Sequence, residues 1–131
     1  MENILVPVSP GEVLDKITIL EIKSERIKDA DKVANVRTEL ALLQDTWSKA
    51  VDGDDDVVRD LHRELKEINE ALWDIEDDIR DKERQKDFDQ EFIELARSVY
   101  YTNDRRSKVK KQLNVHLGSQ IIEEKSYKDY S

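Results

Sequence analysis

Apolar residues recur every three or four positions along most of the chain, which is the spacing of an amphipathic helix. The most regular series lies in the middle of the sequence and steps strictly by four and three residues, as in a coiled coil. It consists of Leu61, Leu65, Ile68, Leu72, Ile75 and Ile79. The preceding segment carries a second series: Val33, Val36, Leu40, Leu43, Trp47 and Val51. With the flanking segments, the pattern predicts four helices, over about residues 10–28, 31–51, 55–85 and 89–117.

Residues typical of helix ends support these boundaries. Ser9 suits the N-cap, Pro10 suits the first turn, and Glu12 is placed to complete a capping box. Gly118 stands where a C-terminal cap is expected. Neither Gly nor Pro separates the first two helices, so their boundary depends on an aspartate at position 29 or 31 acting as a cap.

Both ends of the chain lie outside the helical pattern. In residues 1–8, the alternation of Ile4, Val6 and Val8 favours an extended arm. The tail, residues 118–131, contains the pair Ile121 and Ile122. The two segments could therefore pair as a small two-stranded sheet.

The composition agrees with a mostly α-helical single domain. Only 3 Gly and 2 Pro occur in 131 residues, so turns are few and the elements between them are long. We expect an antiparallel helical bundle with a long hairpin formed by residues 55–85 and 89–117. The apolar seams exceed what one hairpin can bury, so the first two helices or a second copy of the chain must cover them. Homodimerisation is therefore one hypothesis from the sequence.

Charge and cysteine content restrict the possible partners. The net charge of −9 disfavours nucleic acid, and a chain without cysteine fits the cytoplasm. No apolar run is long enough to span a membrane, and no secretory signal is visible at the start. Residues 54–94 carry 17 acids and 7 bases, whereas residues 95–117 carry 6 bases and 1 acid. The two long helices thus have opposite charge.

The last predicted helix breaks its own apolar stripe at Thr102 and Arg106. A buried arginine needs a partner, and the hairpin register places Arg106 opposite residues 66–68. One hypothesis is an ion-pair network with glutamates of the preceding helix: Glu64, Glu67 and Glu70. The other is a polar pocket that captures a phosphate or carboxylate. Its candidate residues are Asn103, Asp104, Arg105 and Arg106, with Lys16 from the first helix.

Carboxylates along residues 67–77 give a weaker candidate for a metal site. Glu67, Glu70, Asp74 and Asp77 recur at steps of three and four residues. Magnesium needs converging oxygen ligands, and the pattern loosely resembles that of all-α nucleotide pyrophosphohydrolases. An acidic, solvated helix face explains the same pattern without any cofactor, and we favour that explanation.

Four segments resemble one family of short helical proteins of bacteria and phages. They are residues 7–23, 72–80, 92–106 and 123–127. The resemblance extends over nearly the whole chain, which implies a stand-alone protein. The family is catalogued only as a domain of unknown function, so the resemblance implies no catalytic or binding residue.

Two functional hypotheses follow from these patterns. The first is a non-catalytic, self-associating helical protein that interacts with a protein partner, because the helical pattern accounts for nearly every residue. The alternative is a small all-α enzyme or ligand binder that uses the arginine region or the carboxylates of residues 67–77.

Overall fold

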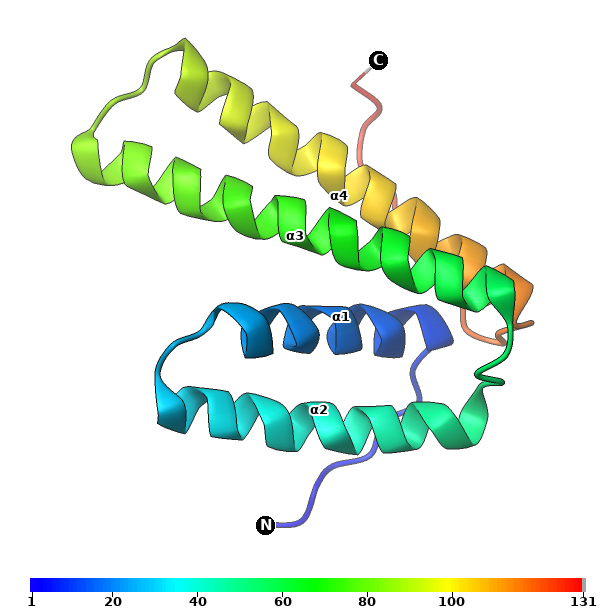
Figure 1. Cartoon of the computed structure of the whole chain (residues 1–131). Coiled ribbons are helices and arrows are strands. Elements are labelled where there is room, and N and C mark those ends of the chain that lie inside the picture. The colour runs from blue at the N-terminus through cyan, green and yellow to red at the C-terminus, as the bar shows by residue number, and fades with distance from the viewer. Residues whose placement is uncertain (131) are drawn as a thin grey trace.

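The computed structural model describes residues 1–130 of the chain. They form four α-helices and no strand: α1 Pro10–Arg26, α2 Ala30–Ala50, α3 Asp56–Gln85 and α4 Gln90–His116. Figure 1 shows two antiparallel hairpins, one of α1 and α2 and a longer one of α3 and α4. The predicted mostly α-helical bundle is confirmed, and every helix begins and ends within two residues of its predicted position.

Side-chain caps fix where the helices begin. The Ser9 hydroxyl accepts a hydrogen bond from the backbone N–H of Glu12 at 3.2 Å. Asp29 accepts from two backbone N–H groups and so separates α2 from α1. Asp55 and Asp89 cap α3 and α4 in the same way. Each cap satisfies N–H groups that the helix itself leaves unpaired, so these short polar residues set where the helices begin.

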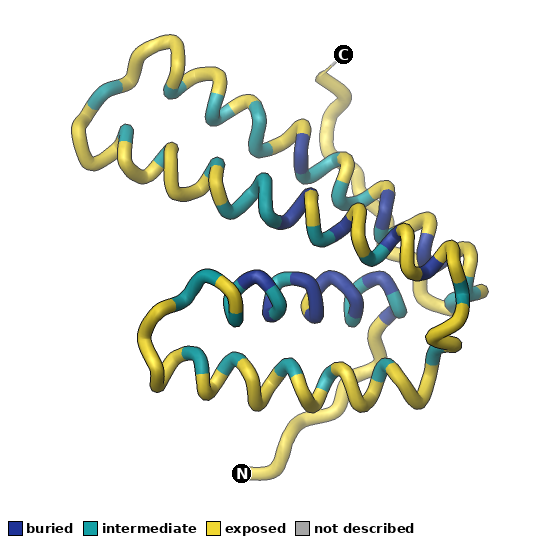
Figure 2. Tube along the Cα trace, in the orientation of Figure 1, coloured by how far each residue is buried: buried dark blue, intermediate teal, exposed yellow. Residues whose placement is uncertain are grey.

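The core lies where α1 crosses the α3–α4 hairpin. α1 packs against all three other helices, whereas α2 packs only against α1. The buried cluster contains Leu14 from α1, four residues of α3 and two of α4. They are Leu14, Val58, Leu61, Leu65, Ile68, Val109 and Leu113. Figure 2 shows this burial concentrated on α1 and on the facing halves of α3 and α4.

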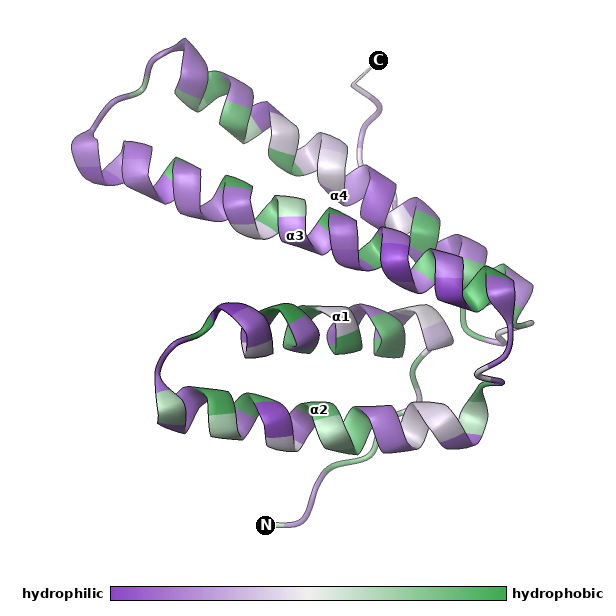
Figure 3. Cartoon of the chain, in the orientation of Figure 1, coloured by the Kyte–Doolittle hydropathy of each residue, from purple (hydrophilic) through white to green (hydrophobic). Residues whose placement is uncertain are grey.

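The remaining apolar seams are only half covered. All six seam residues of α2 are intermediate in burial, and no residue of α2 is buried. Beyond Ile68, the α3 seam at Leu72, Ile75 and Ile79 is also half-exposed. Figure 3 shows hydrophilic residues over most of α3 and a larger hydrophobic share on α1 and α2.

The two-stranded pairing of the chain ends is wrong. Residues 4–8 and 121–127 have no regular secondary structure, and the two termini lie on opposite sides of the molecule (Figure 1). The tail instead follows α4, where Glu123 pairs with Lys110 at 3.6 Å and Glu124 with Lys111 at 3.8 Å. These ion pairs hold the tail away from the arm.

Within residues 1–130, no helix combines the length and the apolar character that a membrane span requires.

Candidate functional site

A buried aspartate of α1 organises the polar centre of the molecule. Asp15 is only 1% exposed, between the apolar residues Leu14 and Ile17. Its carboxylate accepts hydrogen bonds from Arg106 of α4, one of them from Nε at 2.9 Å and the other from Nη2. The amide nitrogen of Asn69 on α3 donates to the same carboxylate at 2.9 Å. One side chain thus joins three helices.

This pairing explains why α4 breaks its apolar stripe. The hydrogen bonds from Arg106 to the Asp15 carboxylate raise the pKa of the guanidinium above its ordinary value, although burial acts in the opposite direction. Thr102, one turn earlier, is also buried. Both polar positions on the stripe therefore face the interior, as the periodicity predicted.

The predicted partners of Arg106 on α3 are wrong. Glu64 and Glu67 are exposed, and the nearest cation to Glu70 is Arg26, at 4.0 Å. The register argument considered only the hairpin of α3 and α4. In the structure α1 lies across that hairpin and supplies the carboxylate, because a partly buried guanidinium is better compensated by a buried anion than by solvated ones.

Every buried side-chain polar atom around Asp15 has a hydrogen-bond partner. The Thr18 hydroxyl donates to the Asp15 carbonyl at 2.8 Å and accepts from the Asn69 amide at 2.9 Å. Lys110 lies 3.8 Å from the Asp15 carboxylate and 2.8 Å from the Glu12 carboxylate, so Glu12 does not serve its predicted capping box. In the described part of the chain, no buried side-chain nitrogen or oxygen lacks a partner.

Gly11 and Asn114 form a second contact that the sequence pattern did not reveal. The backbone N–H of Gly11 donates to the Asn114 side-chain oxygen at 2.7 Å. A Cβ atom at position 11 would lie 2.7 Å from the carbonyl oxygen of Lys110 and 2.9 Å from the Asn114 oxygen. Only glycine therefore allows α1 to approach α4 this closely. The one available signal was a glycine inside the first turn of a predicted helix.

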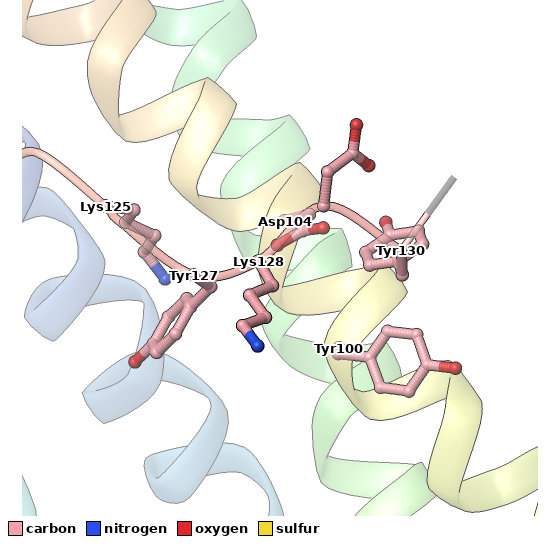
Figure 4. A pocket seen from close by; sticks show the side chains of 7 residues that line it. Tyr100, Asp104, Lys125, Tyr127, Lys128 and Tyr130 are labelled. Carbon is pink, nitrogen blue, oxygen red and sulfur yellow. The ribbon is translucent and has the colours of Figure 1, made fainter.

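The structure separates the predicted binding residues. Lys16 and Arg105 are exposed and take part in none of the hydrogen bonds or ion pairs found within residues 1–130. Asp104 instead faces the tail, in a pocket of about 500 Å³ that Figure 4 shows between α4 and Tyr130. A hydrogen bond from Tyr130 to the Asp104 carboxylate raises the pKa of the tyrosine to about 12. Of the predicted binding residues, only Asn103 and Arg106 line the same pocket.

Asn103 and Arg106 line a second pocket, of about 420 Å³, beside the Asp15 network. Its walls come from α1, α3 and α4, and include Ile19, Leu72, Trp73 and Asn69. Glu76 and Asp77 also line it. Because Asp15 already neutralises Arg106 and Asp77 adds a further carboxylate, this pocket disfavours a phosphate- or carboxylate-bearing ligand.

The predicted metal ligands on α3 are engaged with Arg26 or lie apart from one another. Asp74 accepts a hydrogen bond from Arg26 at 2.6 Å, and Glu70 lies near the same guanidinium. Glu67 is exposed, and Asp77 faces the pocket. Across residues 1–130, no three His, Cys, Asp or Glu side chains are arranged to hold a metal ion. This geometry gives the magnesium alternative no support.

A protein-family model matches nearly the whole chain. Residues 4–130 match the model of a family described as a family of unknown function (DUF6165). The chain belongs to this family. The match includes all four helices, the Asp15 network and the tail, so the whole arrangement described above lies within the family's domain. No match is found among curated proteins or among solved structures.

Proposed function

We propose that this protein is a non-catalytic helical interaction protein that self-associates through α2. The observation that carries the proposal is the position of α2, which packs against one neighbour and contains no buried residue. An amphipathic helix is stabilised mainly by covering its apolar face. A second copy of the chain would complete that cover.

The apolar surface at α2 continues onto the N-terminal arm. Leu42 on α2 is 50% exposed, and Leu5 on the arm is 91% exposed. A groove of about 430 Å³ joins the arm to the end of α2 and is lined by Val6, Val8, Trp47 and Val51. A continuous exposed apolar surface of this kind is typical of interaction sites.

Charge favours a second copy of the chain as the occupant. The protein carries a net charge of −9, yet α2 contains three acids and three bases and is neutral. Two copies can therefore approach through α2 without the repulsion that α3 would cause. In an antiparallel contact about a two-fold axis near Ala41, Arg37 of one copy would lie opposite Asp45 of the other, since both are four residues from Ala41.

The polar centre supports a structural role rather than chemistry. The Asp15 carboxylate is engaged by Arg106 and Asn69, and the two histidines each contact a single carboxylate in separate places. A buried ion pair of this kind commonly fixes how elements pack. The proposed activity is therefore binding.

Sedimentation equilibrium over a range of protein concentrations tests the proposal. We expect the wild-type chain to form a dimer, and Leu42→Glu to weaken it by at least about tenfold because a charge enters the contact. Ile93→Glu is the matched control, since Ile93 is 47% exposed on α4 and lies outside the proposed contact.

A wild-type chain that remains monomeric up to millimolar concentration would contradict the proposal. So would a dimer that Leu42→Glu leaves intact, or one that both substitutions weaken equally, because the contact would then lie away from α2.

A further inference from the structure

The pocket beside the Asp15 network offers a hydrogen-bond acceptor with a fixed direction. The ionised carboxylate of Asp15 only accepts hydrogen bonds, so the nitrogen of the Asn69 amide must face it. The same nitrogen donates to Thr18. Both hydrogen bonds of this side chain therefore use its nitrogen, and the Asn69 oxygen remains as an acceptor on a residue that is only 6% exposed and lines the pocket.

Arg106 supplies a donor next to that acceptor. Its Nε and Nη2 atoms donate to Asp15, which leaves Nη1 without a hydrogen bond within residues 1–130. The side chain is 28% exposed and lines the same pocket. The Asp15 pair fixes the plane of the guanidinium, so the direction of this donor is fixed as well.

Asn103 adds an amide that can donate or accept. It is half-buried on the pocket wall, one turn before Arg106, and its side chain makes none of the hydrogen bonds found in the described chain. The pocket thus offers an acceptor, a donor and one adaptable group on its polar side.

The other walls restrict the shape and charge of a ligand. Ile19, Ile22, Leu72 and the Trp73 ring form an apolar side that suits a flat molecule. Glu76 pairs with Arg80 at 3.2 Å, so Asp77 is the carboxylate that gives the pocket a negative charge, and Arg106, already paired with Asp15, does not offset it. The volume of about 420 Å³ lies within the usual range for small-molecule sites.

We propose that this pocket binds a planar heterocycle that carries a donor beside an acceptor on one edge and no phosphate, as nucleosides do. The Asn69 oxygen and Arg106 Nη1 contact the paired edge, Asn103 contacts a neighbouring polar atom, and the ring lies along Trp73. The site goes beyond self-association, because it lies between α1, α3 and α4 and does not involve α2.

Titration calorimetry of the wild-type chain with adenosine, guanosine, cytidine and uridine tests the site, with the corresponding 5′-monophosphates in parallel. We expect at least one nucleoside to bind, and its monophosphate to bind about tenfold more weakly because Asp77 repels the phosphate. Asp77→Asn should reduce the difference in affinity between the nucleoside and its monophosphate.

Two variants locate the binding. Asn103→Ala removes a half-buried side chain that makes no hydrogen bond in the described chain, so the fold should tolerate it, and affinity should fall about tenfold. Gln112→Ala, at an exposed position farther along α4, is the matched control and should bind as the wild type does. In a Trp47→Phe background Trp73 is the only tryptophan, and its emission should change with the bound nucleoside.

Several results would overturn the proposal. They are the absence of binding by every nucleoside at millimolar concentration, equal affinity of Asn103→Ala and the wild type, and tighter binding of a monophosphate than of its nucleoside. The first two results would show that the pocket does not bind a nucleoside through Asn103. The third would show that the pocket does not exclude a phosphate.

Discussion

α1 and α2 are neighbouring amphipathic helices that occupy opposite environments. α1 has seven buried residues, including the charged Asp15, whereas α2 has none, although it carries a regular apolar seam. α1 contacts three helices and α2 contacts one. The comparison shows that an apolar stripe sets which face of a helix turns inward, while the number of neighbouring elements sets how deeply that face is buried.

The two helices also differ in how they use charge. Asp15 of α1 is enclosed with Arg106, while Asp45 of α2 pairs with Lys49 at a side-chain exposure of 65%. Buried ion pairs are costly to break, whereas exposed pairs contribute little. Substitutions at matched positions on the two helices should therefore give very different results.

The largest difference is expected for the two aspartates. Asp15→Ala leaves Arg106 and Asn69 without their shared acceptor and should lower the free energy of unfolding by about 3–5 kcal/mol. Asp45→Ala should change it by no more than about 0.5 kcal/mol. Urea unfolding followed by circular dichroism measures both. Similar losses for the two variants would contradict the contrast between α1 and α2.

Leucine truncation tests the same comparison for apolar packing. Leu14→Ala removes a side chain that is 0% exposed, and should cost about 2–5 kcal/mol. Leu43→Ala on the half-covered seam should cost about 1 kcal/mol in the monomer. Thermal unfolding of both variants, at low and at high protein concentration, measures the two losses of stability. A loss at Leu43 that grows with concentration would indicate that a second copy covers α2.

Glycine substitution tests the close approach of α1 to α4. Gly11→Ala forces a Cβ atom against the Lys110 carbonyl, and should cost about 1–3 kcal/mol through overpacking. Gly53→Ala, in the turn after α2, meets no atom within 4 Å and should be close to neutral. Chemical unfolding of both variants is the measurement, and an unaffected Gly11→Ala would show that α1 can move away from α4 without loss.

The smallest effect concerns the cap of α3, outside the buried network. A hydrogen bond from His116, followed by backbone N–H groups, holds the pKa of Asp55 below its ordinary value. A carboxyl group with a lowered folded-state pKa contributes stability above its unfolded pKa of about 4, and loses it as the pH falls through the folded value. Asp55→Asn keeps a capping side chain and removes this titration.

The melting temperatures of wild type and Asp55→Asn should therefore differ slightly near pH 6 and converge as the pH falls below the folded-state pKa of Asp55. A difference that stays constant over this range would show that the charge of Asp55 does not contribute. The effect should be smaller than that of Gly11→Ala, because Asp55 is partly open to solvent.

Local signals were sufficient to predict the helices. Ser9, Asp29, Asp55 and Asp89 each satisfy backbone N–H groups close by in sequence, so the chain itself indicates where helices begin. The break in the α4 stripe at Arg106 likewise predicted a buried polar contact. The helix starts and the buried polar contact were both predicted from residues within one or two helical turns of each other.

The partner of Arg106 could not be predicted in the same way. Asp15 is 91 residues away in sequence, and its residue type alone does not distinguish it from the less buried acids Glu21 and Glu25 on the same helix. Pairing along the hairpin favoured the glutamates of α3. The pocket lined by Asn69, Asn103 and Arg106 depends on the same packing, and so does the loss of Lys16 and Arg105 from the candidate site.

The sequence by itself determined the helices, their caps and the side that each turns inward, because these depend on residues three or four positions apart. Only the tertiary structure decided that α1 occupies the centre and α2 the edge. Two helices with equally good apolar faces compete for the same hairpin, and the outcome rests on contacts between distant residues. Gly11 lets α1 approach α4, and Asp15 meets Arg106 and Asn69 there, whereas α2 offers no such contact.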